Sequence, residues 1–224
     1  DQLAVLRVKL VRPNGFEAVW TSRGTNTRQA SIWRPSTRMP WTRGANKERV
    51  CVGDVVVGSF RAPPAEDALV LEVADKSTFR IVGSDAVRRA VEVYLPHPVG
   101  FREVWRRNGS GQQALYVWRP IPPSDAFVAL GFVATVSETP PGVADVRCVP
   151  VAWTSACKVL AQPAWTDEGL GGRPGSLWTV GDRAQRLMVA VGGHEPCEDV
   201  VCLSSANFRI AHYQPEHLAA LRGV

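Results

Sequence analysis

The sequence predicts an all-β fold built from three internal repeats, and three observations lead to it. Tryptophan pairs recur at one spacing, short β-branched runs are bounded by glycine and proline, and helical periodicity is scarce. Three similar β units favour pseudo-threefold symmetry in a β-prism-like arrangement of three small sheets. A β-trefoil is the alternative, although its units are usually shorter. We expect a single domain, 1–224, with repeats at about 15–75, 100–153 and 164–208.

Six of the eight tryptophans mark the repeats. In each copy a glycine follows the first tryptophan, and a second tryptophan comes at the same spacing. The sets are Trp20, Gly24 and Trp33, then Trp105, Gly109 and Trp118, then Trp165, Gly169 and Trp178. A strand, a glycine turn with positive φ or close approach, and a second strand predict a hairpin. Recurrence at one spacing favours a core role for these six side chains.

Further strands are expected around the hairpins. The chain begins on a strand-like run, Leu3–Val11, and each hairpin is followed by a strand near a glycine. These strands are Val50–Val55, Val128–Val133 and Met188–Gly192. In the first two copies a Pro-Pro turn leads to another strand, Ala68–Val73 and Val146–Val151. Cys197–Leu203 is the expected return strand of the third copy.

Helical signals are few. Ser84–Val91 fits a helix capped by Ser84, but Val91–Leu95 fits a strand at least as well. Pro215–Leu221 predicts a short C-terminal helix with proline at its first position.

Composition excludes several classes of protein. No apolar run is long enough for a transmembrane helix, and the net charge of +5 is scattered rather than gathered in the block typical of a nucleic-acid-binding arm. Anionic surfaces remain suitable partners. The five cysteines form no Cys-x-x-Cys pair, which favours a reducing compartment, although a Cys197–Cys202 bridge stays open.

Four segments of the second repeat carry a family resemblance. Phe101–Trp105, Trp118–Pro123, Phe127–Gly131 and Val146–Val149 resemble the vacuolar protein sorting-associated protein 62 family. The same module occurs beside lipid-transfer proteins of the vacuolar protein sorting 13 type. The resemblance implies a role around membranes, trafficking or lipid transport, and it brings no catalytic residues.

Motifs of catalysis and metal binding are scarce. There is no Gly-x-Ser-x-Gly elbow, and the glycine-rich run 169–175 lacks the Gly-Lys-Ser/Thr ending of a phosphate loop. His194, Cys197 and Cys202 offer zinc three ligands where a structural site needs four, so a surface loop and ordinary thiols are favoured. The acidic pairs Glu66–Asp67, Asp167–Glu168 and Glu198–Asp199 fit solvated loops. We therefore expect no enzyme, no cofactor and no metal.

Five residues are the candidate binding residues. Arg34 and Arg119 follow repeat tryptophans and are suited to donate to an anion. Trp41, flanked by Arg38 and Arg43 in an apparent insertion, is a candidate for an exposed contact or membrane anchor. Trp153 is the other tryptophan outside the repeat.

These observations favour a non-enzymatic module that binds a protein partner or an anionic membrane surface in trafficking or lipid transport. It would be part of a larger assembly, cytoplasmic and peripherally membrane-associated, without nucleic acid. Two alternatives stay open: a lectin-like module that binds glycans through loop tryptophans, and a structural interface domain of a large complex.

Overall fold

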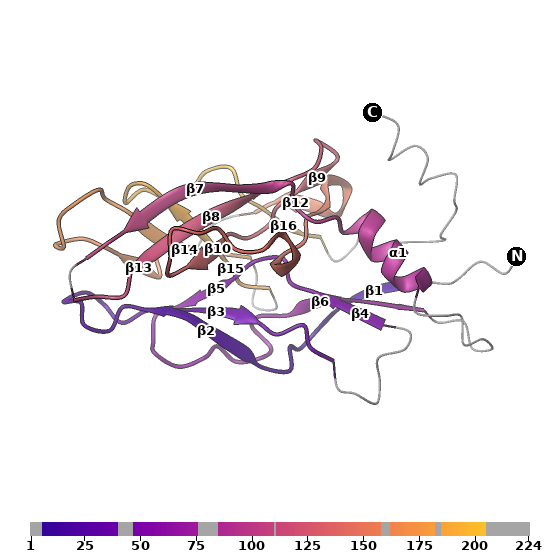
Figure 1. The fold of residues 1–224 in the computed structure, drawn as a ribbon, viewed down its shortest axis with the longest axis horizontal. Helices are drawn as coiled ribbons and strands as arrows, with labels where there is room; N and C mark the ends of the chain where they lie inside the picture. The colour runs from indigo at the N-terminus through magenta and orange to yellow at the C-terminus, as the bar shows by residue number, and fades with distance from the viewer. Residues whose placement is uncertain are drawn as a thin grey trace, which may run out of the picture.

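The computed structural model describes residues 6–39, 47–75, 85–109, 111–157, 162–181 and 185–204. In these residues the chain is all-β, as predicted, with several small antiparallel sheets, none of them closed, and a single α-helix. Figure 1 shows the strands of the first repeat along one side of the molecule, those of the second repeat along the other, and α1 at one end.

Each predicted repeat supplies one three-stranded antiparallel sheet, in which the predicted hairpin is joined by a later strand. The strands predicted over Val50–Val55 and Val128–Val133 are wrong in their middle, because residues 51–54 and 129–132 direct their backbone hydrogen bonds to other repeats. The first sheet holds β2 (Phe16–Thr21), β3 (Ser31–Pro35) and β5 (Val55–Val57); the second holds β7 (Gly100–Arg107), β8 (Leu115–Ile121) and β10 (Val133–Thr135); the third holds β13 (Trp165–Thr166), β14 (Ser176–Val180) and β15 (Leu187–Val191). The register repeats as well, since Trp33 faces Val55, Trp118 faces Val133 and Trp178 faces Val189.

The three sheets meet in a ring of backbone hydrogen bonds. The N–H of Asp54 donates to the carbonyl of Phe132 over 2.9 Å, that of Phe132 to Met188 over 2.8 Å, and that of Met188 back to Asp54 over 2.8 Å. Each residue lies one position before the one that faces the second tryptophan of its repeat. The ring therefore ties equivalent points of the three copies together, while the pseudo-threefold symmetry, the prism and the single domain stay predictions.

The first tryptophans of the three repeats pack together in the core. Trp165 lies 5.3 Å from Trp20 and 6.0 Å from Trp105 between ring centroids, and all three are at most 2% exposed. Each indole N–H donates to the hairpin loop of another repeat: Trp20 to the Gln113 carbonyl, Trp105 to the Arg173 carbonyl and Trp165 to the Thr27 hydroxyl. The tryptophans thus fill the core and link the copies.

The remaining described tryptophans are also mostly covered. Trp118 and Trp178 are buried, and Trp33 is half-buried with its N–H bonded to Ser31 Oγ. Trp153 lies outside the repeat spacing, but it is 6% exposed and belongs to the core, so it offers no contact surface. Trp41 lies outside the described residues.

A further sheet and the helix lie beside the β2–β3–β5 sheet. β1 (Leu6–Val11) and β4 (Lys47–Val50) pair with the central β6 (Val70–Asp75), and α1 (Asp85–Tyr94) contacts β4 and β6. The strand alternative for Val91–Leu95 is therefore wrong. Val87, Ala90 and Val91 are buried at helical spacing on one side of α1.

Two pairs of short strands complete the described part. β9 (Phe127–Val128) pairs with β11 (Val149–Pro150), and β12 (Thr154–Ala156) pairs with β16 (Val201–Leu203). The strand predicted over Val146–Val151 shortens to β11, because the N–H groups of Arg147 and Cys148 donate to the carbonyls of Cys51 and Pro96, which lie outside any strand. The return strand predicted over Cys197–Leu203 shortens to β16 and joins β12, not the third sheet. The helix predicted over Pro215–Leu221 lies outside the described residues.

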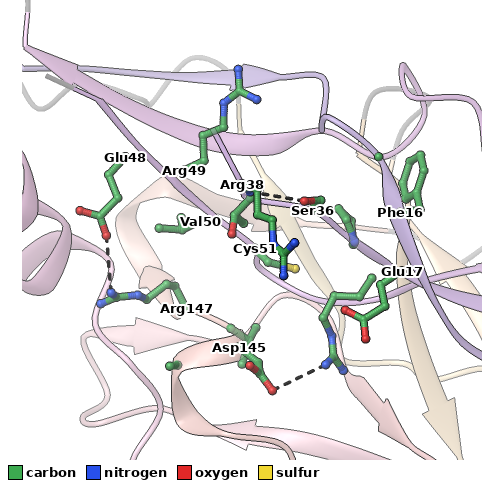
Figure 2. A pocket seen from close by; sticks show the side chains of 16 residues that line it. Phe16, Glu17, Ser36, Arg38, Glu48, Arg49, Val50, Cys51, Asp145 and Arg147 are labelled. Atoms are coloured by element: carbon green, nitrogen blue, oxygen red, sulfur yellow. Dashed lines mark hydrogen bonds and ion pairs between the residues drawn. The ribbon is translucent and has the colours of Figure 1, made fainter. Parts of the chain in front are cut away.

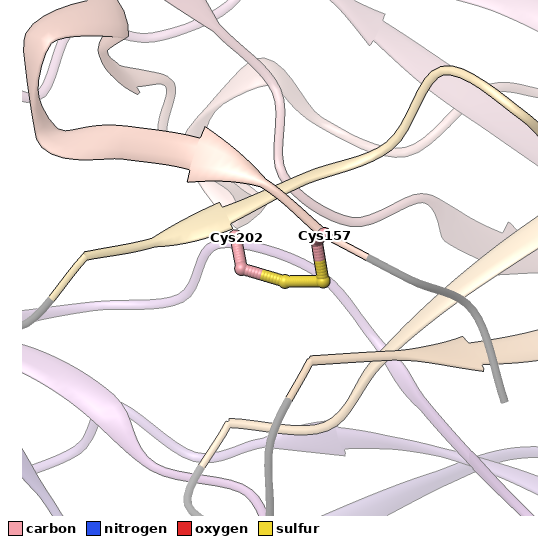
Figure 3. The surroundings of a disulfide bond; sticks show 2 residues. All are labelled: Cys157 and Cys202. Carbon is pink, nitrogen blue, oxygen red and sulfur yellow. A yellow bond between two sulfur atoms is a disulfide. The ribbon is translucent and has the colours of Figure 1, made fainter.

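A disulfide joins Cys157, the residue after β12, to Cys202 in the middle of β16 (Figure 3). Cys202 therefore does not pair with Cys197, which is a free thiol. Disulfides persist mainly in oxidising compartments, so this bond weighs against the predicted reducing one.

The structure also tests the predicted turn glycines and the predicted lack of a transmembrane helix. Gly24 and Gly169 have positive φ, 81° and 82°, but in the second repeat Gly111 takes φ 76° in place of Gly109. Within the described ranges, no helix is long and apolar enough to span a membrane.

Candidate functional site

A groove of about 830 Å3 lies where the β2–β3–β5 sheet meets β4 and the second repeat (Figure 2). Four segments line it: the start of β2, the end of β3 with the residues after it, β4 with Cys51, and the turn around η2 (Val143–Asp145). The charged lining residues are Arg34, Arg38, Arg49 and Arg147, with Glu17, Glu48 and Asp145. The groove is therefore polar and carries both signs of charge.

Arg34 is held at the base of the groove by Asp54. Its Nε donates to Asp54 Oδ1 over 2.8 Å and its Nη2 to Oδ2 over 3.1 Å, while Asp145 lies 3.6 Å from Nη1. Asp54 is fully buried and also accepts the N–H of Ala134 over 2.8 Å. Burial alone would lower the pKa of Arg34, but the charge and hydrogen bonds of Asp54 outweigh it and raise that pKa. This pair fixes the first repeat to the second.

Two other arginines of the groove are also paired. Arg147 lies 3.8 Å from Glu48 and donates to the Leu95 carbonyl, and Arg49 donates to Glu72 over 3.0 Å. Burial raises the pKa of Glu48 and lowers that of Arg147. The Arg147–Glu48 pair joins the wall formed by β4 to the turn around η2, and the Arg49–Glu72 pair joins β4 to β6.

Arg38 differs from the other three arginines. Its backbone N–H donates to Ser36 Oγ and its carbonyl accepts from Asn14, but its exposed guanidinium has no ion pair with any described residue. Figure 2 shows the Arg38 side chain reaching into the groove. Glu17, on β2, likewise has no ion pair in the described part of the chain. The groove thus offers one uncommitted cation and one uncommitted carboxylate.

The thiol of Cys51 lines the groove but is a poor nucleophile. Burial, with the nearby charge of Asp54, raises the pKa of Cys51 to about 12, and Sγ donates to the Gly53 carbonyl. A thiol in this state holds almost no thiolate at neutral pH.

The structure brings together two of the five candidate binding residues, Arg34 and Arg38. Arg119 lies elsewhere, exposed on β8 with its guanidinium 5.9 Å from the Phe132 ring. Trp41 and Arg43 fall outside the described residues. Glu48, Arg49 and Arg147 also line the groove but carry no signal in the sequence, because only tertiary packing places them there.

Two of the three residues considered as zinc ligands have other partners in the structure. His194 Nε2 lies 2.9 Å from Asp167 Oδ1, and Cys202 is in the disulfide. Asp167 is 3% exposed and also pairs with Arg107, so its expected place in a solvated loop is wrong. It accepts the N–H of Gly175 across its hairpin, which explains its burial.

Part of the chain matches a protein-family model, and nearly all of it is similar to a solved structure. Residues 71–170, from β6 to just past β13, match the family model of vacuolar protein sorting-associated protein 62, which confirms the predicted resemblance over that segment. The crystal structure of GNIP1Aa from Chromobacterium piscinae is similar with a TM-score of 0.62 and 22% identity. The likeness covers 98% of this chain and 40% of that one, and it shows the fold alone. No curated protein matches the chain.

Proposed function

We propose that this chain is a non-enzymatic binding module of a membrane-trafficking assembly, and that its groove holds an extended acidic segment of a protein partner. The observation that carries the proposal is the uncommitted guanidinium of Arg38 in a groove whose other arginines are ion-paired. A carboxylate entering the groove would replace water at Arg38 without breaking an existing ion pair.

The shape of the groove favours a chain segment over a flat bilayer. A planar membrane cannot follow a concave surface, whereas an extended segment can place alternate side chains along it. Glu17 adds an acceptor on the opposite strand, β2, which suits a backbone or basic N–H of the same segment.

The chemistry of the lining supports a binding role. The thiol of Cys51 is protonated at neutral pH, and the carboxylates of Glu48 and Asp145 are occupied by Arg147 and Arg34. The match to a family described by vacuolar protein sorting supports the trafficking context. The described tryptophans do not line this groove, so the glycan-binding alternative receives no support from it.

We also infer that the three sheets form a pseudo-threefold β-prism. The backbone ring of Asp54, Phe132 and Met188 and the chain of indole hydrogen bonds both run from one repeat to the next and return to the first. Such closed sets are expected when three similar units surround one axis.

Fluorescence anisotropy with labelled peptides tests the groove. The probes are an extended peptide of alternating glutamate and serine and its glutamine and lysine counterparts, at low salt. We expect the acidic peptide to bind best, and Arg38→Gln to weaken it about tenfold through loss of a charge-assisted hydrogen bond. Arg61→Gln is the matched control, since Arg61 follows the end of β5, is exposed and does not line the groove. Equal binding by Arg38→Gln, or no preference for the acidic peptide, contradicts the proposal.

A further inference from the structure

The first and second repeats carry different residues at three equivalent positions beside the second tryptophan. In the first repeat they hold Glu17, Arg34 and Asp54. The register shows that Arg102 faces Arg119 in the second repeat, as Glu17 faces Arg34 in the first. Phe132 stands at the place of Asp54, one position before the residue that faces the tryptophan.

The net charge at these positions is therefore negative in the first repeat and positive in the second. Two carboxylates surround the arginine of the first repeat, whereas two arginines and a phenyl ring stand in the second. Like charges directly opposite each other on antiparallel strands repel. Arg102 and Arg119 are both exposed, and neither has an ion pair with a described residue. Glu103, the next residue of β7, pairs with Arg106 at 3.6 Å.

An apolar edge lies beside the two arginines. Ile121 is two residues beyond Arg119 on β8, so both side chains stand on the same face, and Ile121 is 42% exposed. Val99 is 67% exposed, and its N–H donates to the Ile121 carbonyl over 2.9 Å. Cations next to exposed aliphatic side chains are typical of surfaces that rest on a lipid interface.

We propose that this edge of the β7–β8 hairpin is a membrane-contact surface. Arg102 and Arg119 bind the phosphate groups of anionic lipid headgroups, which relieves their mutual repulsion, while Val99 and Ile121 enter the interface. The inference goes beyond the groove, because it uses different residues and a different partner. A soluble phosphate would satisfy the arginines but not the aliphatic side chains, and this favours a membrane.

Vesicle co-sedimentation tests the proposal, with phosphatidylcholine vesicles that contain or lack phosphatidylserine. The wild-type chain is expected to bind only the vesicles with phosphatidylserine. Arg102→Gln with Arg119→Gln is expected to weaken binding roughly 25-fold, at about fivefold for each arginine near an anionic surface. Ile121→Ser is expected to weaken binding severalfold even at a salt concentration that screens the arginines.

The control is Arg28→Gln with Arg61→Gln, which removes the same charge from exposed sites of the first repeat. It should bind within about twofold of wild type, because the surface potential acts mainly on charges near the membrane. Absence of wild-type binding, full binding by the Arg102/Arg119 variant, or an equal loss in the control overturns the proposal. Arg38→Gln should still bind vesicles, and the Arg102/Arg119 variant should still bind the acidic peptide, so the two proposals fail separately.

Discussion

The guanidinium of Arg34 holds the buried carboxylate of Asp54 through two hydrogen bonds, and the same carboxylate accepts the N–H of Ala134 in the second repeat. This pair lies beside the backbone ring and at the base of the groove. It ties the end of β3, one wall of the groove, to the second repeat.

Removing one partner of this pair is expected to destabilise the fold. Asp54→Ala leaves a mostly buried guanidinium without its carboxylate and should lower the free energy of unfolding by about 3 kcal/mol. Urea denaturation measures the change. Asp125→Ala, at an exposed turn residue, is the control and should change stability by less than about 0.5 kcal/mol. Equal stability of the two variants would show that the pair does not hold the repeats together.

The centre of the three sheets tolerates no added side chain. A Cβ at Gly53, whose φ is 151°, would lie 2.6 Å from the Cα of Gly131, closer than such atoms approach. Gly53→Ala should therefore cost about 1–3 kcal/mol. A Cβ at Gly15 meets nothing within 4 Å, so Gly15→Ala should be close to neutral in the same thermal or urea melt. A neutral Gly53→Ala speaks against the close approach of the first and second repeats.

The free thiols are expected to differ in reactivity. Burial raises the pKa of both Cys51 and Cys148 to about 12, whereas Cys197 is half-buried. At pH 8 only about one in ten thousand of the buried thiols is a thiolate. Iodoacetamide should label Cys197 alone in the native protein, and Cys51 and Cys148 only in denaturant, as read by mass spectrometry. Cys157 and Cys202 should react only after reduction; labelling of either in the native protein contradicts the disulfide.

Glu72 gives the stability a defined dependence on pH. Burial alone would raise the pKa of Glu72, but hydrogen bonds and charges of Arg49, Lys9 and Lys47 outweigh it and lower that pKa. A carboxyl whose pKa is lower in the folded than in the unfolded state stabilises the fold above its ordinary pKa. That contribution disappears as the pH falls through the lowered value.

Glu72→Gln should therefore be less stable than wild type at pH 7, because the neutral amide loses the attraction of the carboxylate to Arg49, Lys9 and Lys47. The gap should shrink as the pH falls below about 4.5. Unfolding by urea at a series of pH values measures both chains. A gap that stays constant down to pH 2 contradicts the assigned role of Glu72.

The sequence predicted the local parts of this architecture well. The tryptophan spacing located the three hairpins because a hairpin depends on neighbouring strands and a short turn. It did not predict that each indole N–H reaches another repeat, or that Cys157 is the partner of Cys202, since both contacts depend on how the units pack. Helix α1 was ambiguous because Val87, Ala90 and Val91 fit one helical face while Val91 and Val93 also fit an alternating strand.

The candidate site was predictable only in part. The sequence predicts Arg38 as a binding residue because it lies near Trp41, and Arg34 because it follows a repeat tryptophan. Glu48, Arg49 and Arg147 carry no motif, and they meet Arg38 only because β4 and the turn around η2 converge there. The burial of Asp54, which turns Arg34 into a structural residue, depends on the second repeat and has no local signal.

Chemical-shift mapping with the acidic peptide tests the central claim, that the groove is a binding site, most directly. Titration of isotope-labelled protein should shift the backbone amides of Thr37 and Arg38, of Glu48–Cys51 and of Asp145–Arg147, all of which line the groove. The β13–β14–β15 sheet contributes no residue to the groove, so the chemical shifts of its amides should not change. Shifts confined to other surfaces, or the same shifts in Arg38→Gln with equal affinity, would contradict the account.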